Sequence, residues 1–125
     1  MLKEMKDTRQ IPGEGYRRWF NDDAFDLFLW YPDDNPREPS GFQLCYGKSD
    51  TGGIHTDRAL TWKRAEGFSH DAIDTGRYSP TEHRSPILVA DGIFPKERIT
   101  AEFDARSTGI GRDIRDFVLS KLREY

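Results

Sequence analysis

The sequence predicts a single α+β domain, and three observations lead to this class. Short segments with alternating apolar side chains, separated by turn-forming residues, occupy the first ninety positions. From Pro95 onward the apolar spacing changes to three and four residues, which is typical of helices. A chain of 125 residues has room for one hydrophobic core. We therefore predict one domain over residues 1–125: an antiparallel meander sheet of about five strands, with two C-terminal helices packed on one face.

Each strand is predicted from apolar alternation or from a short apolar run, after a polar lead-in over residues 1–15. The predicted extended segments are residues 16–20, 24–31, 41–46, 58–63, 68–73 and 86–90. Residues 32–39 contain three prolines, which cannot donate ladder hydrogen bonds, and therefore form a loop. Residues 47–56 and 75–85 are polar or glycine-containing connections, and residues 64–67 form a tight turn.

Two helices are predicted at the C-terminal end. Pro95 stands where a helix would begin, and Ile99 and Phe103 then share one helical face. The last segment has a single stripe with the spacing of an amphipathic helix. That stripe consists of Ile114, Phe117, Val118, Lys121 and Leu122. A small closed barrel plugged by the last helix is the competing architecture.

Side-chain alternation predicts that the two sheet faces differ in character. One face is wholly apolar or aromatic and should pack beneath the helices. Its members are Phe25, Leu27, Leu29, Tyr31, Phe42, Leu44 and Tyr46.

The opposite face mixes large aromatic side chains with polar and charged ones. Its predicted members are Arg17, Trp19, Asp26, Phe28, Trp30, Gln43 and Cys45. Each large aromatic side chain can bury roughly 150–250 Å². We therefore expect this face to be closed by residues 32–40 and 47–56, by a second copy of the chain, or by a ligand.

Composition and spacing argue against several classes of function. The chain has 19 basic and 22 acidic side chains and no basic half, so nucleic acid is not an expected partner. The single Cys45 excludes an intrachain disulfide, and the three histidines lack metal-ligand spacing. We predict neither a metal nor a cofactor. No apolar run approaches 18 residues, which leads us to expect a cytoplasmic protein without a membrane segment.

The leading functional hypothesis is a non-catalytic binding or interaction module that uses the mixed face. Its partner could be a second copy, another protein or a small molecule. The alternative is a small enzyme that uses Asp26 with a histidine or Cys45 in a pocket on that face. An arginine paired with Asp26 favours the binding module, whereas Asp26 in a pocket with His70 favours catalysis. The sequence leaves open whether the protein is an enzyme.

Distinctive stretches of sequence occur at residues 9–14, 17–20, 25–27 with Trp30, 41–46, 58–62 and 86–92. Together they cover most of the chain and resemble an uncharacterised family of small bacterial proteins. This resemblance implies a bacterial source and a compact single domain, and the family has no assigned activity.

Overall fold

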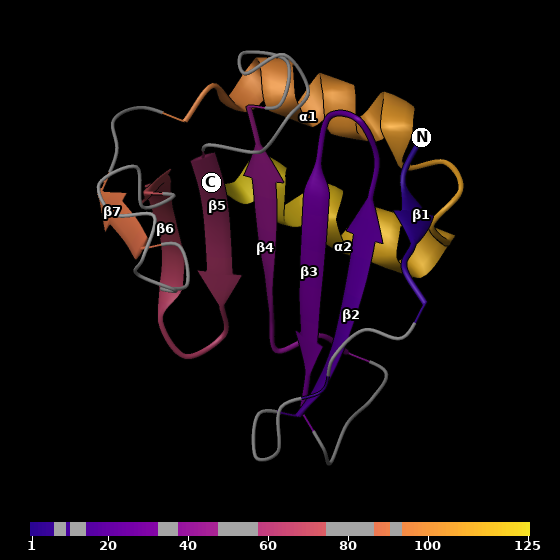
Figure 1. The fold of residues 1–125 in the computed structure, drawn as a ribbon, viewed down its shortest axis with the longest axis horizontal. Helices are drawn as coiled ribbons and strands as arrows, with labels where there is room; N and C mark the ends of the chain where they lie inside the picture. The colour runs from indigo at the N-terminus through magenta and orange to yellow at the C-terminus, as the bar shows by residue number, and fades with distance from the viewer. Residues whose placement is uncertain (7–9, 11–14, 33–37, 48–57, 75–86, 91–93) are drawn as a thin grey trace, which may run out of the picture.

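The computed structural model describes residues 1–6, 10, 15–32, 38–47, 58–74, 87–90 and 94–125. Within these residues the chain forms a sheet of seven strands followed by two helices (Figure 1). The strands are β1 (Lys3–Glu4), β2 (Tyr16–Asn21), β3 (Asp26–Tyr31), β4 (Gly41–Tyr46), β5 (Arg58–Lys63), β6 (Gly67–Asp74) and β7 (Ile87–Ala90). The helices are α1 (Lys96–Arg106) and α2 (Arg112–Glu124).

The strands are antiparallel neighbours in chain order, from β1 at one edge to β7 at the other. The predicted α+β meander with two C-terminal helices is confirmed. In the described part of the chain no ladder joins β1 to β7, so the sheet is open and the competing barrel is not formed. The six predicted extended segments correspond to β2–β7, and β1 is an additional strand. Strand β1, with only two residues, is too short to show alternation.

Strand β3 begins two residues later than predicted because a side chain caps the turn before it. The Asp22 carboxylate accepts the backbone N–H groups of Ala24 and Phe25, each at 2.8 Å. Such a bond holds both residues in the turn instead of the ladder. Phe25 keeps its predicted orientation and meets Phe103 of α1 edge-on, with ring centroids 6.2 Å apart.

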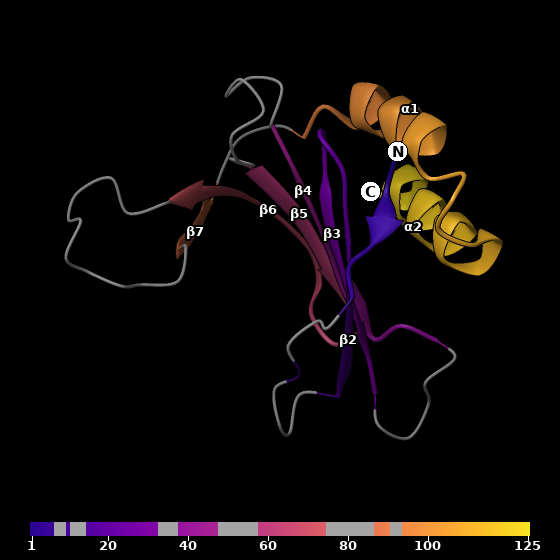
Figure 2. The same cartoon turned by 45° about the vertical axis from the view of Figure 1, so that its right-hand side comes forward.

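Both helices lie on one side of the sheet, and β6 and β7 bend away from them (Figure 2). The core between sheet and helices contains the predicted apolar face together with buried side chains of both helices. The fully buried large side chains there include Phe20, Leu27, Leu29, Phe42, Leu44, Leu60, Ile99, Phe103 and Leu122.

The buried stripe of α2 differs from the predicted one at three positions, because Leu119 is added and Phe117 and Lys121 are only partly buried. The buried residues are Ile114, Val118, Leu119 and Leu122. Phe117 is only half-buried and lies edge-on against Trp62, with centroids 5.6 Å apart. Lys121 places its Nζ 4.2 Å above the same indole ring. The aromatic and aliphatic parts of these side chains therefore cover Trp62 at the margin of the core.

Asp22 also joins the β2–β3 turn to α1. Its carboxylate, 2% exposed, lies 3.3 Å from the Arg106 guanidinium. Burial opposes ionisation, but the N–H groups of Ala24 and Phe25 and the Arg106 charge outweigh it. Together they hold the pKa of the Asp22 carboxyl below its usual range.

We expect Asp22→Asn to lower the free energy of unfolding by about 1–3 kcal/mol at neutral pH, the range for a lost charged hydrogen bond. A lowered folded-state pKa stabilises the protein above the unfolded pKa, and this contribution disappears as pH falls through the folded value. Urea unfolding of both proteins should therefore converge below about pH 4. Asp23→Asn, at an exposed neighbouring position, is the control. A difference that stays constant from neutral to acidic pH would contradict this role for the Asp22 charge.

Candidate functional site

The sheet face opposite the helices is called the open face, and its side chains fall into three rows across strands β2–β6. The cationic row contains Arg17, Trp30, Gly41, Lys63 and Gly67. The central row contains Trp19, Phe28, Gln43, Thr61 and Ser69. The acidic row contains Asn21, Asp26, Cys45, Ala59 and Asp71. All seven side chains that the sequence assigned to the mixed face lie in these rows.

An aromatic pair occupies one end of the central row. The Trp19 and Phe28 rings stack with centroids 5.8 Å apart and planes inclined by 11°. Both are half-buried, as is Trp30 in the neighbouring row. Since stacked aromatics contribute large areas with few rotatable bonds, they are suited to the centre of a contact surface.

The Asp26 carboxylate accepts hydrogen bonds from two uncharged donors of the same face. Its Oδ1 accepts the Trp19 indole N–H at 3.2 Å and an N–H of the Asn21 amide. The sequence left Arg17, Arg18 and Arg58 as possible partners. Of these, Arg18 lies on the helix side, where the Glu4 carboxylate accepts two of its N–H groups.

Trp30 forms part of the wall of two hollows on the open face. The larger, of about 510 Å³, is lined by Arg17, Lys63 and Arg64 on its charged side. The smaller, of about 210 Å³, extends toward Gln43 and Thr61. The Lys63 ammonium lies 6.0 Å from the centroid of the Trp30 ring. This part of the face therefore combines an indole surface with cations.

Thr61 presents a buried polar group without a partner. Its side chain lines the smaller hollow, the residue is 7% exposed, and its Oγ1 has no hydrogen-bond partner among the described residues. A buried hydroxyl left unbonded costs about 1–3 kcal/mol. Because this oxygen is itself buried, a partner docked on the open face does not reach it, and the unbonded hydroxyl is a local cost of packing that sequence reasoning missed.

The structure brings together only one of the two pairs that the enzyme hypothesis offers. Asp26 and Cys45 are directly opposite in the β3–β4 ladder. His70 pairs with Leu60 and therefore lies on the helix side. There it is buried, stacks on Tyr46 and shares a hydrogen bond with its hydroxyl. Cys45 is 4% exposed, a setting in which thiols usually serve as small hydrophobes. His55 and His83 lie outside the described residues.

No family model, curated protein or solved structure matches this chain. The resemblance to an uncharacterised bacterial family therefore stays a prediction. No helix in the described ranges is long and apolar enough to cross a membrane. Among the same residues, no group of three or more His, Cys, Asp and Glu side chains is placed to hold a metal ion.

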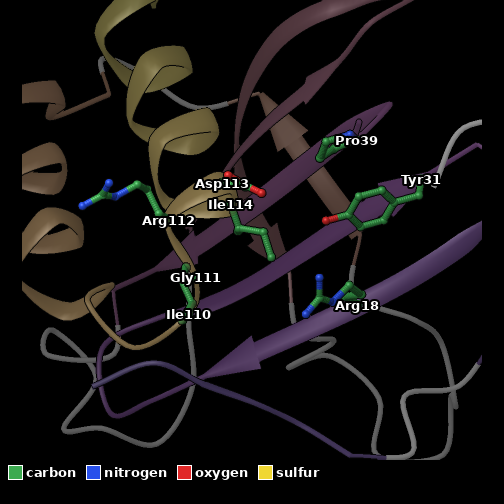
Figure 3. Close-up of a pocket in the computed structure, with 8 residues that line it drawn as sticks. All are labelled: Arg18, Tyr31, Pro39, Ile110, Gly111, Arg112, Asp113 and Ile114. Carbon is green, nitrogen blue, oxygen red and sulfur yellow. The ribbon is translucent and has the colours of Figure 1, made fainter. Parts of the chain in front are cut away.

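A second cavity, of about 710 Å³, lies on the helix side at the start of α2. Figure 3 shows the Tyr31 hydroxyl and the Arg18 guanidinium directed toward Ile114, while the Arg112 side chain extends away from them. Burial raises the pKa of Tyr31, and the Arg18 charge opposes this rise. The hydrogen bond from Arg18 lowers the pKa of Glu4 against the opposing effect of its partial burial.

This second cavity is a weaker candidate than the open face. The Glu4 carboxylate already engages the Arg18 guanidinium through two contacts of 2.7 Å. The Asp113 carboxylate also lines the cavity and would repel an anion drawn to the helix start. Sequence reasoning missed this cavity because it forms only where α2 packs against β2 and β3. The sole local signal was the glycine pair around Ile110.

Proposed function

We propose that this protein is a non-catalytic interaction module that binds a protein partner through its open face. The observation that carries the proposal is the position of Trp30. Its half-buried indole stands between two hollows on the face that the helices leave uncovered. Interface centres are enriched in aromatic residues and arginine, which is the composition found around Trp30.

The neighbouring residues support the same proposal. The stacked Trp19–Phe28 pair extends the apolar surface away from Trp30. By contrast, the described residues of this face supply no histidine beside Asp26, so catalysis by that pair has less support.

Selection of peptides from a random display library tests the proposal while the natural partner is still unidentified. The protein is immobilised at low density, and bound phage are compared on the unmodified chain, on Trp30→Glu and on Tyr16→Glu. Tyr16 provides the control because it is an exposed aromatic residue of β2. It pairs with Tyr31 and therefore lies on the helix side of the sheet. We expect enriched peptides to bind Trp30→Glu at least about tenfold more weakly, a loss of about 1.4 kcal/mol, and Tyr16→Glu with unchanged affinity.

Two outcomes would overturn the proposal. One is the failure of any peptide to be enriched on the unmodified chain. The other is an enriched pool that binds Trp30→Glu as tightly as the unmodified chain, which would place binding elsewhere on the surface.

A further inference from the structure

The charged side chains of the open face are divided between its two ends. Arg17 and Lys63 lie in the cationic row, and Asp26 and Asp71 lie in the acidic row. The rows are four residues apart along each strand, or about 13 Å at the usual rise of a strand. Two described cations lie at the acidic end: Lys3 beside Asn21 at the β1 edge, and Arg58, which precedes Ala59 and lies on the helix side.

Such a division makes the face complementary to itself in one orientation. We propose that the partner is a second copy of this chain, packed open face to open face about a two-fold axis that runs across the strands along the central row. This inference rests on the proposed function, since it names the partner of the same face. Closed two-fold dimers are the commonest form of homo-oligomer, and they use one surface patch on both subunits.

The axis brings opposite charges together. It places the cationic row of one copy over the acidic row of the other. Lys63 then lies over the partner's Ala59, whose neighbour in the β5–β6 ladder is Asp71. Arg17 lies over the partner's Asn21, whose neighbour in the β2–β3 ladder is Asp26. Since packed sheets are about 10 Å apart, these long side chains can reach the carboxylates one strand away.

The other simple arrangement is electrostatically unfavourable. A two-fold axis parallel to the strands would place the cationic rows over each other and the acidic rows likewise, which costs energy. The Lys63 ammonium now lies 3.9 Å from the exposed Glu66 carboxylate. Exposed pairs of this kind contribute little, so Lys63 can exchange this partner for one across the interface.

The central row lies on the proposed axis and meets its own copy. The Trp19–Phe28 pair loses water-accessible area there, which supplies the apolar part of the contact. The Gln43 amide of the same row also meets its own copy and supplies polar groups to the contact. Because the face spans only three rows, we expect a weak dimer with a dissociation constant in the micromolar range or above.

Charge exchange between two variants tests this arrangement. Sedimentation velocity is run from about 1 to about 500 µM on the unmodified chain, on Lys63→Glu, on Asp71→Lys and on their equimolar mixture. Arg98→Glu and Asp116→Lys carry the same charge changes at exposed helix positions and serve as matched controls. Circular dichroism establishes that each variant is folded.

We expect the unmodified chain and both controls to dimerise, more weakly at high salt because the ion pairs are screened. Each single open-face variant should dimerise at least about tenfold more weakly, since it opposes like charges at two symmetric places. The mixture should dimerise again, because each new side chain then faces one of opposite charge. A dimer that the mixture fails to restore would overturn the arrangement.

An unmodified chain that remains monomeric over the whole range would overturn self-association itself. The peptide selection separates this failure from that of the proposed function. Peptides that depend on Trp30 would show that the face binds a different protein, whereas their absence would remove the binding face as well.

Discussion

The Leu27→Glu variant is expected not to fold at 25 °C. Leu27 is 0% exposed and lies in the centre of the sheet, between Phe20 of β2 and Leu44 of β4 on the helix side. Removing a buried leucine side chain alone costs about 2–5 kcal/mol. A carboxylate in the same position adds the penalty of an unpaired buried charge, and the sum equals or exceeds the stability of a typical small domain.

Far-UV circular dichroism and the amide spectrum of the purified variant provide the measurement. Both should show the loss of fixed structure under conditions in which the unmodified chain is folded. Leu27→Met, which nearly conserves volume, is the matched control and should cost less than about 1.5 kcal/mol. A folded Leu27→Glu protein with a dispersed amide spectrum would contradict the proposed position of the core.

Phe103→Ala should lower the free energy of unfolding by about 3–5 kcal/mol, the usual range for emptying a buried aromatic position. Phe103 is 0% exposed and joins α1 to the β2–β3 turn through its edge-on contact with Phe25. Urea unfolding measures the change, with Arg98→Ala at an exposed position of the same helix as the control. Equal stability of Phe103→Ala and Arg98→Ala would show that α1 is not docked on the sheet in this way.

Much of the fold could be predicted because alternation is a local property. The spacing in residues 24–31 and 41–46 assigned Leu27, Leu29, Phe42 and Leu44 to the buried face, and the structure buries all four. Details that depend on tertiary packing could not be predicted. Leu119 falls outside the five-residue stripe of α2 but is buried by neighbours that no helical spacing reveals. The start of β3 depends on hydrogen bonds of a single side chain, Asp22.

For the candidate site, the sequence predicted which side chains share a face but not the hollows between them. Alternation within each strand assigned Trp30 and Cys45 to the mixed face, and the β3–β4 ladder pairs Trp30 with Gly41 and Asp26 with Cys45. The hollows beside Trp30 require a side wall from the β5–β6 turn, where Arg64 lies, and the buried Thr61 hydroxyl reflects packing from several strands.

His70 became a candidate partner for Asp26 because alternation within one strand does not tell which face of a distant strand lies on the same side of the sheet. The ladder from β3 to β6 shows that they lie on opposite faces.

Urea unfolding of Trp30→Glu determines whether Trp30 belongs to the surface or to the core. Trp30 lies on the same strand as Leu27 but on the opposite face, so the same charged residue is introduced on the two sides of one sheet. We predict a cooperative transition for Trp30→Glu, within about 1.5 kcal/mol of the unmodified chain at micromolar concentration, because the new carboxylate remains accessible to water. Loss of folded structure in Trp30→Glu, as expected for Leu27→Glu, would make Trp30 a core residue and would contradict the existence of the open face.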